Sequence, residues 1–137
     1  MSTGPFRILV TGSRLFDDRP QMVRALSDAS AIPGRDRQLV LRHGGAKGAD
    51  AVADAVWTDW NLLWPRWLKP EVFMADWDQY GKKAGSMRNT RMLEDLVEGE
   101  QVDLVLGFPL ARSIGTWDCL RKAKAKDIPI RNYGATT

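Results

Sequence analysis

A glycine-rich turn, HGGAKGAD, spans residues 43–50 and constrains this chain more than any other segment. It follows a strand-like run, residues 38–42, and leads directly into an alanine-rich run of helical character. A turn of this kind lets the backbone approach a ligand closely, and it points free N–H groups and the positive end of a helix dipole at that ligand. The sequence therefore predicts a strand-to-helix junction that binds an anion, with phosphate as the natural occupant.

Strand-like and helix-like runs alternate along the whole chain. Apolar, β-rich runs predict strands at 6–11, 38–42, 72–74, 102–108 and 128–131. Capping residues and helical periodicity predict helices at 21–30, 49–61, 86–98 and 116–126, with 62–69 irregular or a broken helix extension and 76–85 a long polar loop. Such alternation is typical of an α/β fold that is Rossmann-like and doubly wound, with a mostly parallel five-stranded sheet and helices on both faces.

The expected sheet also predicts where a ligand binds. We expect a single domain over residues 6–132, with flexible ends at 1–5 and 133–137. In doubly wound sheets, ligands bind beyond the carboxyl ends of the strands, where the strand order reverses. The loop at 12–14 is therefore expected to face the loop at 108–116, with the 43–50 turn beside them.

The composition narrows the class of protein. At 137 residues and 44% hydrophobic, the chain has the size and make-up of one globular domain without an apolar run of membrane length. We expect no signal peptide, no membrane partner and a cytoplasmic location. The single histidine and single cysteine disfavour a zinc site, so we expect no metal and no cofactor, although carboxylate-bound magnesium stays open. A net charge of +3 permits an anionic ligand and makes a nucleic-acid partner unlikely.

The turn matches neither common nucleotide fingerprint. It lacks the G-x-G-x-x-G spacing of dinucleotide-binding folds and the G-K-[ST] ending of a P-loop, which disfavours dehydrogenase and P-loop NTPase functions. An alternative is a plain turn in which the acidic residue only caps the next helix and the lysine is solvated. The candidate ligand-binding residues of the turn are Gly44, Gly45, Lys47, Gly48 and Asp50.

The loop after the first strand supplies a second set of candidates. Gly12 permits a tight turn, Ser13 offers a hydroxyl, and the guanidinium group of Arg14 can bind phosphate or carboxylate oxygens in a bidentate manner. A turn with an exposed arginine is the alternative. His43, at the end of the second strand, is expected to anchor its loop by hydrogen bonds rather than to act in catalysis.

The third helix is predicted to begin at a Ser86 cap, with Arg88 and Asn89 in its first turn. A cation in the first turn opposes the helix dipole, so Arg88 indicates an anionic ligand or a carboxylate partner, with a surface arginine as the alternative. Asp76 precedes this helix in the polar loop and is a further candidate.

The fourth helix is predicted to begin at Thr116, which is both a good cap and a possible phosphate ligand. Gly115 allows a close approach of the ligand, and Arg112 and Ser113 in the preceding loop are candidate phosphate donors. Asp118 would lie in the first turn, where a carboxylate suits the dipole even without a function.

Trp57, Trp60, Trp64 and Trp67 recur at spacings of three and four, which is helical periodicity. This stripe predicts a face packed on the core. A subunit interface, where aromatic residues are enriched, is the alternative.

Together these motifs resemble the SLOG superfamily, and within it the YspA/YpsA-related branch, a domain of unknown function. The resemblance covers nearly the whole chain and is carried by residues 11–14, 43–50, 76–81, 84–89 and 115–118. It implies a Rossmann-like fold that binds nucleotides or nucleotide-derived ligands. Relatives in the superfamily include the LOG phosphoribohydrolases, which are commonly dimers, and the DprA DNA-binding proteins.

In LOG enzymes an arginine and a glutamate cleave an N-glycosidic bond, and a Pro-Gly-Gly-x-Gly-Thr loop holds the phosphate. The resemblance assigns these roles to Arg88, Asp118 and the pair Gly115 and Thr116. Two features depart from the LOG pattern: aspartate is one methylene shorter than glutamate, and the paired glycines of the phosphate loop are absent. Catalytic geometry tolerates such displacement poorly, whereas ligand binding tolerates it better.

The first hypothesis is therefore a sensor or sequestering module for a nucleotide-derived small molecule, and we expect it to be a homodimer. Arg14 and Arg88 would bind its charge, and Asp76 or Asp118 would accept hydrogen bonds from ribose hydroxyls. A nucleoside-monophosphate phosphoribohydrolase, with Arg88 and Asp118 catalytic, is the alternative. DprA-like nucleic-acid binding is a second alternative.

Overall fold

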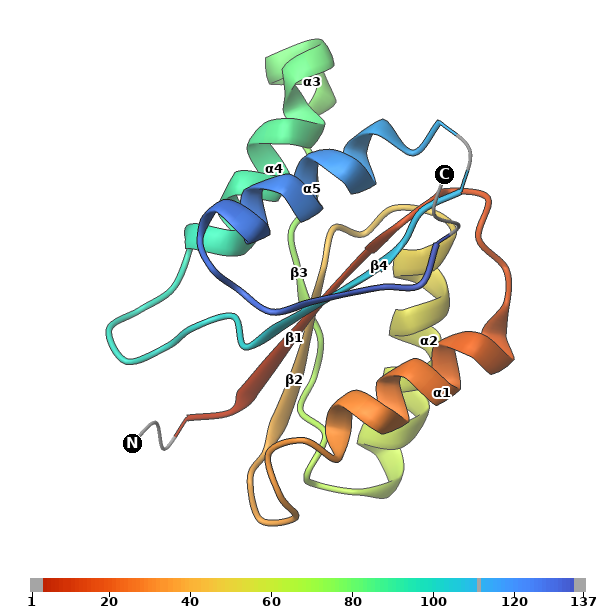
Figure 1. The fold of residues 1–137 in the computed structure, drawn as a ribbon, viewed down its shortest axis with the longest axis vertical. Coiled ribbons are helices and arrows are strands. Elements are labelled where there is room, and N and C mark those ends of the chain that lie inside the picture. The colour runs from red at the N-terminus through yellow and green to blue at the C-terminus, as the bar shows by residue number, and fades with distance from the viewer. Residues whose placement is uncertain (1–3, 111, 135–137) are drawn as a thin grey trace.

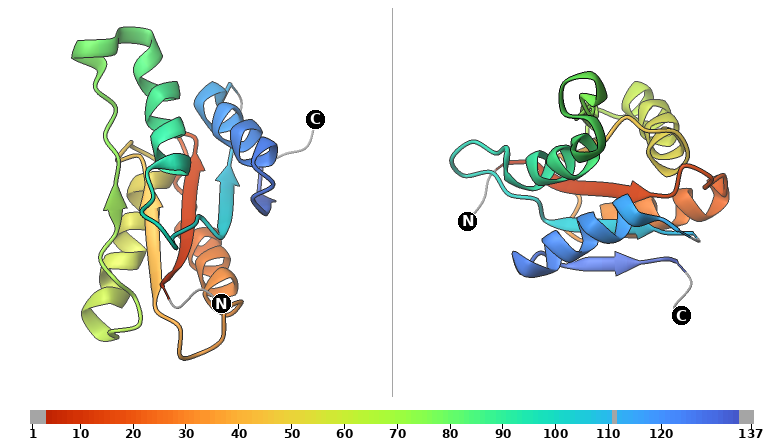
Figure 2. Two further views of the ribbon diagram at one scale, coloured as in Figure 1. Left: turned by 90° about the vertical axis from the view of Figure 1, so that its left-hand side faces the viewer. Right: turned by 90° about the horizontal axis from the view of Figure 1, so that it is seen from above.

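A parallel five-stranded sheet organises the protein. The computed structural model describes residues 4–110 and 112–134. All neighbouring strand pairs within this part of the chain are parallel. The strand order (Figure 2, left) is β3 (Glu71–Val72), β2 (Leu39–His43), β1 (Phe6–Gly12), β4 (Leu104–Phe108) and β5 (Ile130–Asn132). The order reverses between β1 and β4, as in Rossmann-like sheets, so the predicted fold class is confirmed.

Helices cover both faces of this sheet (Figure 1). One face carries α1 and α2 and the other carries α4 and α5, while α3 and η1 lie at the start of α4. None of the helices in the described part of the chain combines the length and apolar character needed to cross a membrane. Their bounds are α1 (Arg19–Ser30), α2 (Ala49–Leu63), α3 (Trp77–Tyr80), η1 (Gly81–Lys83), α4 (Ala84–Glu94) and α5 (Ile114–Ala125).

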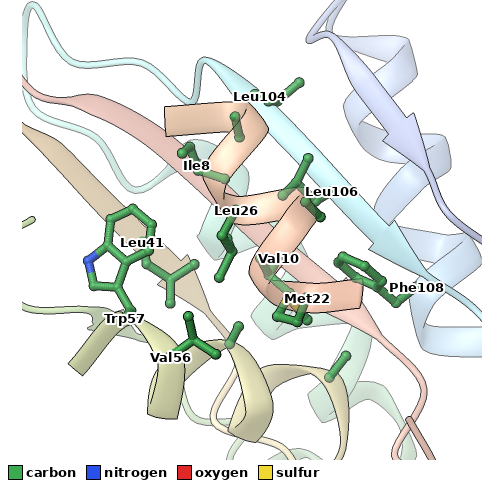
Figure 3. Packing of buried hydrophobic residues seen from close by; sticks show 14 of the residues in the cluster. Ile8, Val10, Met22, Leu26, Leu41, Val56, Trp57, Leu104, Leu106 and Phe108 are labelled. Atoms are coloured by element: carbon green, nitrogen blue, oxygen red, sulfur yellow. The ribbon is translucent and has the colours of Figure 1, made fainter. Parts of the chain in front are cut away.

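Alternation along β1 divides the interior into two cores. Ile8 and Val10 face α1 and α2, whereas Leu9 faces α4 and α5. Figure 3 shows the larger core, in which Met22 and Leu26 of α1 and Trp57 of α2 meet the central strands. Because β1 and β4 carry apolar side chains on both faces, their sequences are nearly continuous apolar runs.

The predicted packing of the tryptophan stripe on the core is right for Trp57 and wrong for Trp64. Trp57 is fully buried, and Trp60 and Trp67 pack against the core from outside. Trp64 is 51% exposed because α2 ends one residue before it and the chain turns at Pro65. Residues 66–68 then run beside β2, with Leu68 N donating to Leu39 O at 2.8 Å.

The predicted starts of two helices are wrong. Residues 77–83 of the expected loop form α3 and η1, because the Asp76 carboxylate caps the turn by accepting from Gln79 N. The following helix, α4, already begins at Ala84, so Ser86 is not its cap. The last helix, α5, begins at Ile114 after Ser113, so Thr116 is not a cap either.

The predicted flexible ends fall partly on residues 1–3 and 135–137, which lie outside the described residues. The adjoining residues are held: Gly4 O accepts from Arg37 Nε at 2.9 Å, and the Tyr133 ring stacks on Phe108 with a centroid separation of 5.0 Å.

Gly48 leaves no room for a side chain, because its φ of +77° is combined with a Cβ position already filled by the backbone oxygen of Ser13. We expect Gly48→Ala to lower the free energy of unfolding by about 1–3 kcal/mol from backbone strain, and by more from the collision. Gly34→Ala is the matched control, since Gly34 has a φ of +86° with nothing within 4 Å of the added carbon. Urea unfolding of both variants measures the difference, and equal losses would contradict the close approach at Gly48.

Candidate functional site

A cleft of about 490 Å³ opens at the carboxyl ends of β1 and β4, where the strand order reverses. Gly12 and Phe108, the last residues of these strands, are register partners. The loops that follow them face each other across the cleft, and the 43–50 turn lies beside them, as the sequence predicted. Predicted site residues that line this cleft are Gly12, Ser13, Arg14, Asp50, Arg88, Asn89, Arg112, Ser113, Gly115 and Thr116.

Arginines from separate loops and helices give the cleft its positive charge. Arg14 and Arg88 border both the cleft and a neighbouring hollow of about 280 Å³, which also contains Gly44, Gly45 and Lys47. Lys47 is exposed, and the structure places it in the hollow rather than in the cleft.

Arg88 is held in place by the protein. Its Nε donates to Asn89 Oδ1 at 3.0 Å and its Nη1 donates to Gly44 O at 2.7 Å. Burial lowers the pKa of Arg88, the nearby charge of Asp50 raises it, and the like charge of Arg14 lowers it further. Since the remaining nitrogen, Nη2, makes no hydrogen bond to any described residue, the guanidinium group keeps a free edge.

Three amides of the glycine-rich turn are not free, contrary to the prediction. Gly44 N and Ala46 N both donate to Asp50 Oδ2, at 3.1 and 3.3 Å, and Gly45 N donates to His43 Nδ1 at 2.9 Å. Three amides that would have faced a phosphate are therefore paired inside the protein. The amides of Gly44, Gly45 and Ala46 therefore shape one wall of the site and are not anion donors.

His43 is the loop anchor that the sequence predicted. It is buried, and since Nδ1 accepts from Gly45, Nε2 carries the proton and donates to Asp54 Oδ2 at 2.6 Å. The imidazole therefore ties the turn to α2.

Asp50 does more than the predicted helix cap. It lies in the first turn of α2, whose cap residue is Gly48, and its side chain reaches back to the turn. Its other oxygen, Oδ1, is buried and has no hydrogen-bond partner among the described residues. Burial raises the pKa of Asp50, and the hydrogen bonds from the amides of Ala46 and Gly44 and the charge of Arg88 only partly oppose this effect.

The first turn of α5 contributes the donors that the glycine-rich turn lacks. Gly115 N and Thr116 N belong to the opening turn, where amides have no partner within the helix. Ser113 Oγ accepts from Leu110 N at 2.8 Å, which leaves its hydrogen available to a ligand. Arg112, with a φ of +63°, brings another cation to this edge of the cleft.

Asp118 does not line the cleft. It is the fifth residue of α5 rather than a first-turn residue, and its Oδ2 accepts from Asn89 Nδ2 at 3.1 Å and from Lys122 Nζ at 3.0 Å. Burial alone would raise the pKa of Asp118, but these donors outweigh it and the pKa lies below its ordinary value. The carboxylate joins α4 to α5, and it does not lie with Arg88 at the cleft.

Other predicted positions also shift. Arg88 is the fifth residue of α4, so its charge does not oppose the dipole of a first turn. Asp76 is exposed and lies outside the cleft at the start of α3.

Sequence reasoning missed the apolar rim of the cleft. Leu15 and Ile114 are 79% and 80% exposed, and Trp77 is 49% exposed with Arg14 over its ring at 5.7 Å. No local signal in the sequence identifies them, because single exposed apolar residues are common and only the structure shows that these three line one cleft.

The sequence was compared with known proteins. It is 41% identical over 129 residues to the Gene 61 protein of Mycobacterium phage D29, with 93% of this chain and 96% of the relative covered. The chain belongs to the Gene 61 protein family. No family model and no solved structure matches the sequence. The name of the relative states no activity, so inference about function rests on the cleft.

We expect Asp118→Asn to lower the free energy of unfolding by about 1 kcal/mol at pH 7, since it weakens a partly solvated ion pair. Because the pKa of Asp118 is lowered in the folded protein, the ionised carboxylate adds to the free energy of unfolding. This stabilisation is present above the pKa of the unfolded state and is lost as pH falls through the pKa of the folded state. Urea unfolding at pH 7 and below pH 4 should therefore show a difference from wild type that shrinks in acid. A constant difference would contradict the ion-pair role.

Proposed function

We propose that this protein binds a phosphorylated, nucleotide-derived small molecule in the cleft between β1 and β4. The phosphate lies between the guanidinium groups of Arg14 and Arg88 and the first turn of α5. The carrying observation is that both guanidinium groups face one cleft while Arg14 makes no hydrogen bond to any described residue. Anions with several oxygens are the ligands that such groups bind best.

The electrostatics support an anion at this place. Arg14 lowers the pKa of Arg88, which means that the two cations repel each other across the cleft. Asp50 is the one carboxylate lining the cleft within the described residues, and it cannot balance both charges and Arg112. A phosphate with two negative charges relieves this repulsion, and the free amides at a helix N-terminus add to its binding.

The size and the rim of the cleft support a nucleotide rather than free phosphate. A volume of about 490 Å³ falls within the range of small-molecule sites. The exposed side chains of Leu15, Trp77 and Ile114 offer apolar surface to a flat ring at the mouth. The resemblance to the SLOG superfamily agrees with this ligand class.

The geometry favours binding over the phosphoribohydrolase alternative. The role assigned by resemblance to Asp118 needs a carboxylate in the cleft, whereas this side chain is paired with Asn89 and Lys122. Release of free base from AMP, abolished in Asp118→Asn, would support the hydrolase.

Self-association stays a prediction, which light scattering at high protein concentration tests. DprA-like DNA binding would appear as affinity that falls steeply with salt.

We expect Arg14→Ala and Arg88→Ala each to weaken AMP binding by about 1.5–3 kcal/mol, the usual contribution of a charge-assisted hydrogen bond. Isothermal titration against AMP, ADP-ribose and inorganic phosphate measures the loss. Arg14→Ala is the cleaner variant, because Arg88 also bonds to Gly44 O within the protein.

Arg24→Ala is the matched control, since it removes an exposed arginine of α1 that does not line the cleft. It should leave the affinity unchanged. Absence of binding to every ligand of the panel, or equal losses in Arg24→Ala and Arg14→Ala, would overturn the proposal.

A further inference from the structure

One oxygen of Asp50 has no role in holding the fold together. The turn is tied by Oδ2 alone, which accepts from Gly44 N and Ala46 N. Oδ1 is buried without a hydrogen-bond partner in the described part of the chain, on a residue that is only 5% exposed. A buried carboxylate oxygen without a donor costs stability, so its retention points to a donor from outside the protein.

The position of Asp50 fits a ligand contact. Its side chain lines the same cleft as Arg14, Arg88 and the first turn of α5. The charge of Arg88 lowers the pKa of Asp50, yet the hydrogen bonds of Arg88 go to Asn89 and to Gly44 rather than to Asp50. The carboxylate is fixed by two loop amides and by its place at the start of α2, where the helix dipole favours a negative charge.

We propose that Asp50 Oδ1 accepts a hydrogen bond from a sugar hydroxyl of the bound ligand and thereby selects ribose-bearing phosphates. This inference rests on the proposed function. It identifies the sugar as a recognised part of the ligand, which the phosphate contacts alone do not specify. It replaces Asp76 and Asp118 in the role that the sequence assigned to them, because neither lines the cleft.

The chemistry of the site selects a hydroxyl over the other groups of a nucleotide. A carboxylate repels phosphate oxygens, so Asp50 does not contact the phosphate that the arginines bind. The base is expected at the apolar rim formed by Leu15, Trp77 and Ile114. The sugar lies between phosphate and base, and its hydroxyls are neutral donors that a buried carboxylate oxygen can accept without a further charge.

The test compares AMP, 2′,3′-dideoxy-AMP and inorganic phosphate by isothermal titration on the whole protein. Wild type should bind AMP about 10-fold or more tightly than the dideoxy compound, as expected for one hydrogen bond to a charged group. In Asp50→Asn, the amide oxygen keeps the two loop donors and the amide nitrogen takes the place of Oδ1. The amide nitrogen can still donate to the hydroxyl oxygen, but that hydrogen bond is neutral and weaker than one to a carboxylate, so the ratio should fall several-fold (roughly 5-fold), while phosphate affinity stays the same or rises.

Asp59→Asn is the matched control, since Asp59 is an exposed carboxylate of α2 that pairs with Arg19 and does not line the cleft. It should keep the wild-type ratio. The wild-type ratio also tests the inference without any variant, should Asp50→Asn fail to fold. Binding of AMP and phosphate with no preference over the dideoxy compound, or a preference in Asp50→Asn as large as in wild type, would overturn the inference and leave the proposed function standing. No binding of AMP or phosphate to wild type would instead overturn the proposed function.

Discussion

The backbone of Ser13 is the junction on which the rest of the cleft depends. Its N–H donates to Phe108 O at 3.0 Å and its carbonyl accepts from Ala49 N at 3.0 Å, so one residue joins the ends of β1 and β4 to the start of α2. This contact brings the backbone of residues 13 and 14 against Gly48, where a side chain would not fit. The glycine-rich turn is therefore needed first for packing. Earlier in the same turn, the amides of Gly44, Gly45 and Ala46 donate inward, to Asp50 and His43.

The arginines of this chain divide into two kinds by what they contact. Arg7 and Arg42 are almost fully buried, and both bond to Glu71 at 2.9 Å, with further bonds to Glu100 and to the end of α4. Hydrogen bonds and charges from these arginines outweigh the burial of Glu71 and lower its pKa. Arg14 has no such carboxylate partner among the described residues and lies at an open cleft. The paired arginines, Arg7 and Arg42, stabilise the sheet, whereas Arg14 lies at the candidate ligand site.

Much of the fold could be predicted from the sequence because local rules decide it. Apolar runs located the central strands, and capping residues with helical periodicity placed the start of α1 at residue 21, two residues after its start at Arg19. The starts of α4 and α5 were missed, since Ser86 and Thr116 are good caps by type while the chain had already become helical two residues earlier. Helix capping preferences rank residues but cannot choose between neighbouring positions when tertiary contacts also act.

The site was only half predictable, because distant partners decide the role of each polar residue. The loops that converge on the cleft follow from sheet topology, which the strand pattern fixes. The pairing of Asp118 with Asn89, by contrast, joins residues 29 positions apart on two helices, and no local pattern encodes it. Asp50 and Asp118 both lie near the start of a helix, yet their pKa values shift in opposite directions. Both oxygens of Asp118 accept hydrogen bonds, whereas Asp50 Oδ1 has no donor among the described residues. A candidate ligand contact is therefore recognised by the hydrogen bond that the protein does not supply.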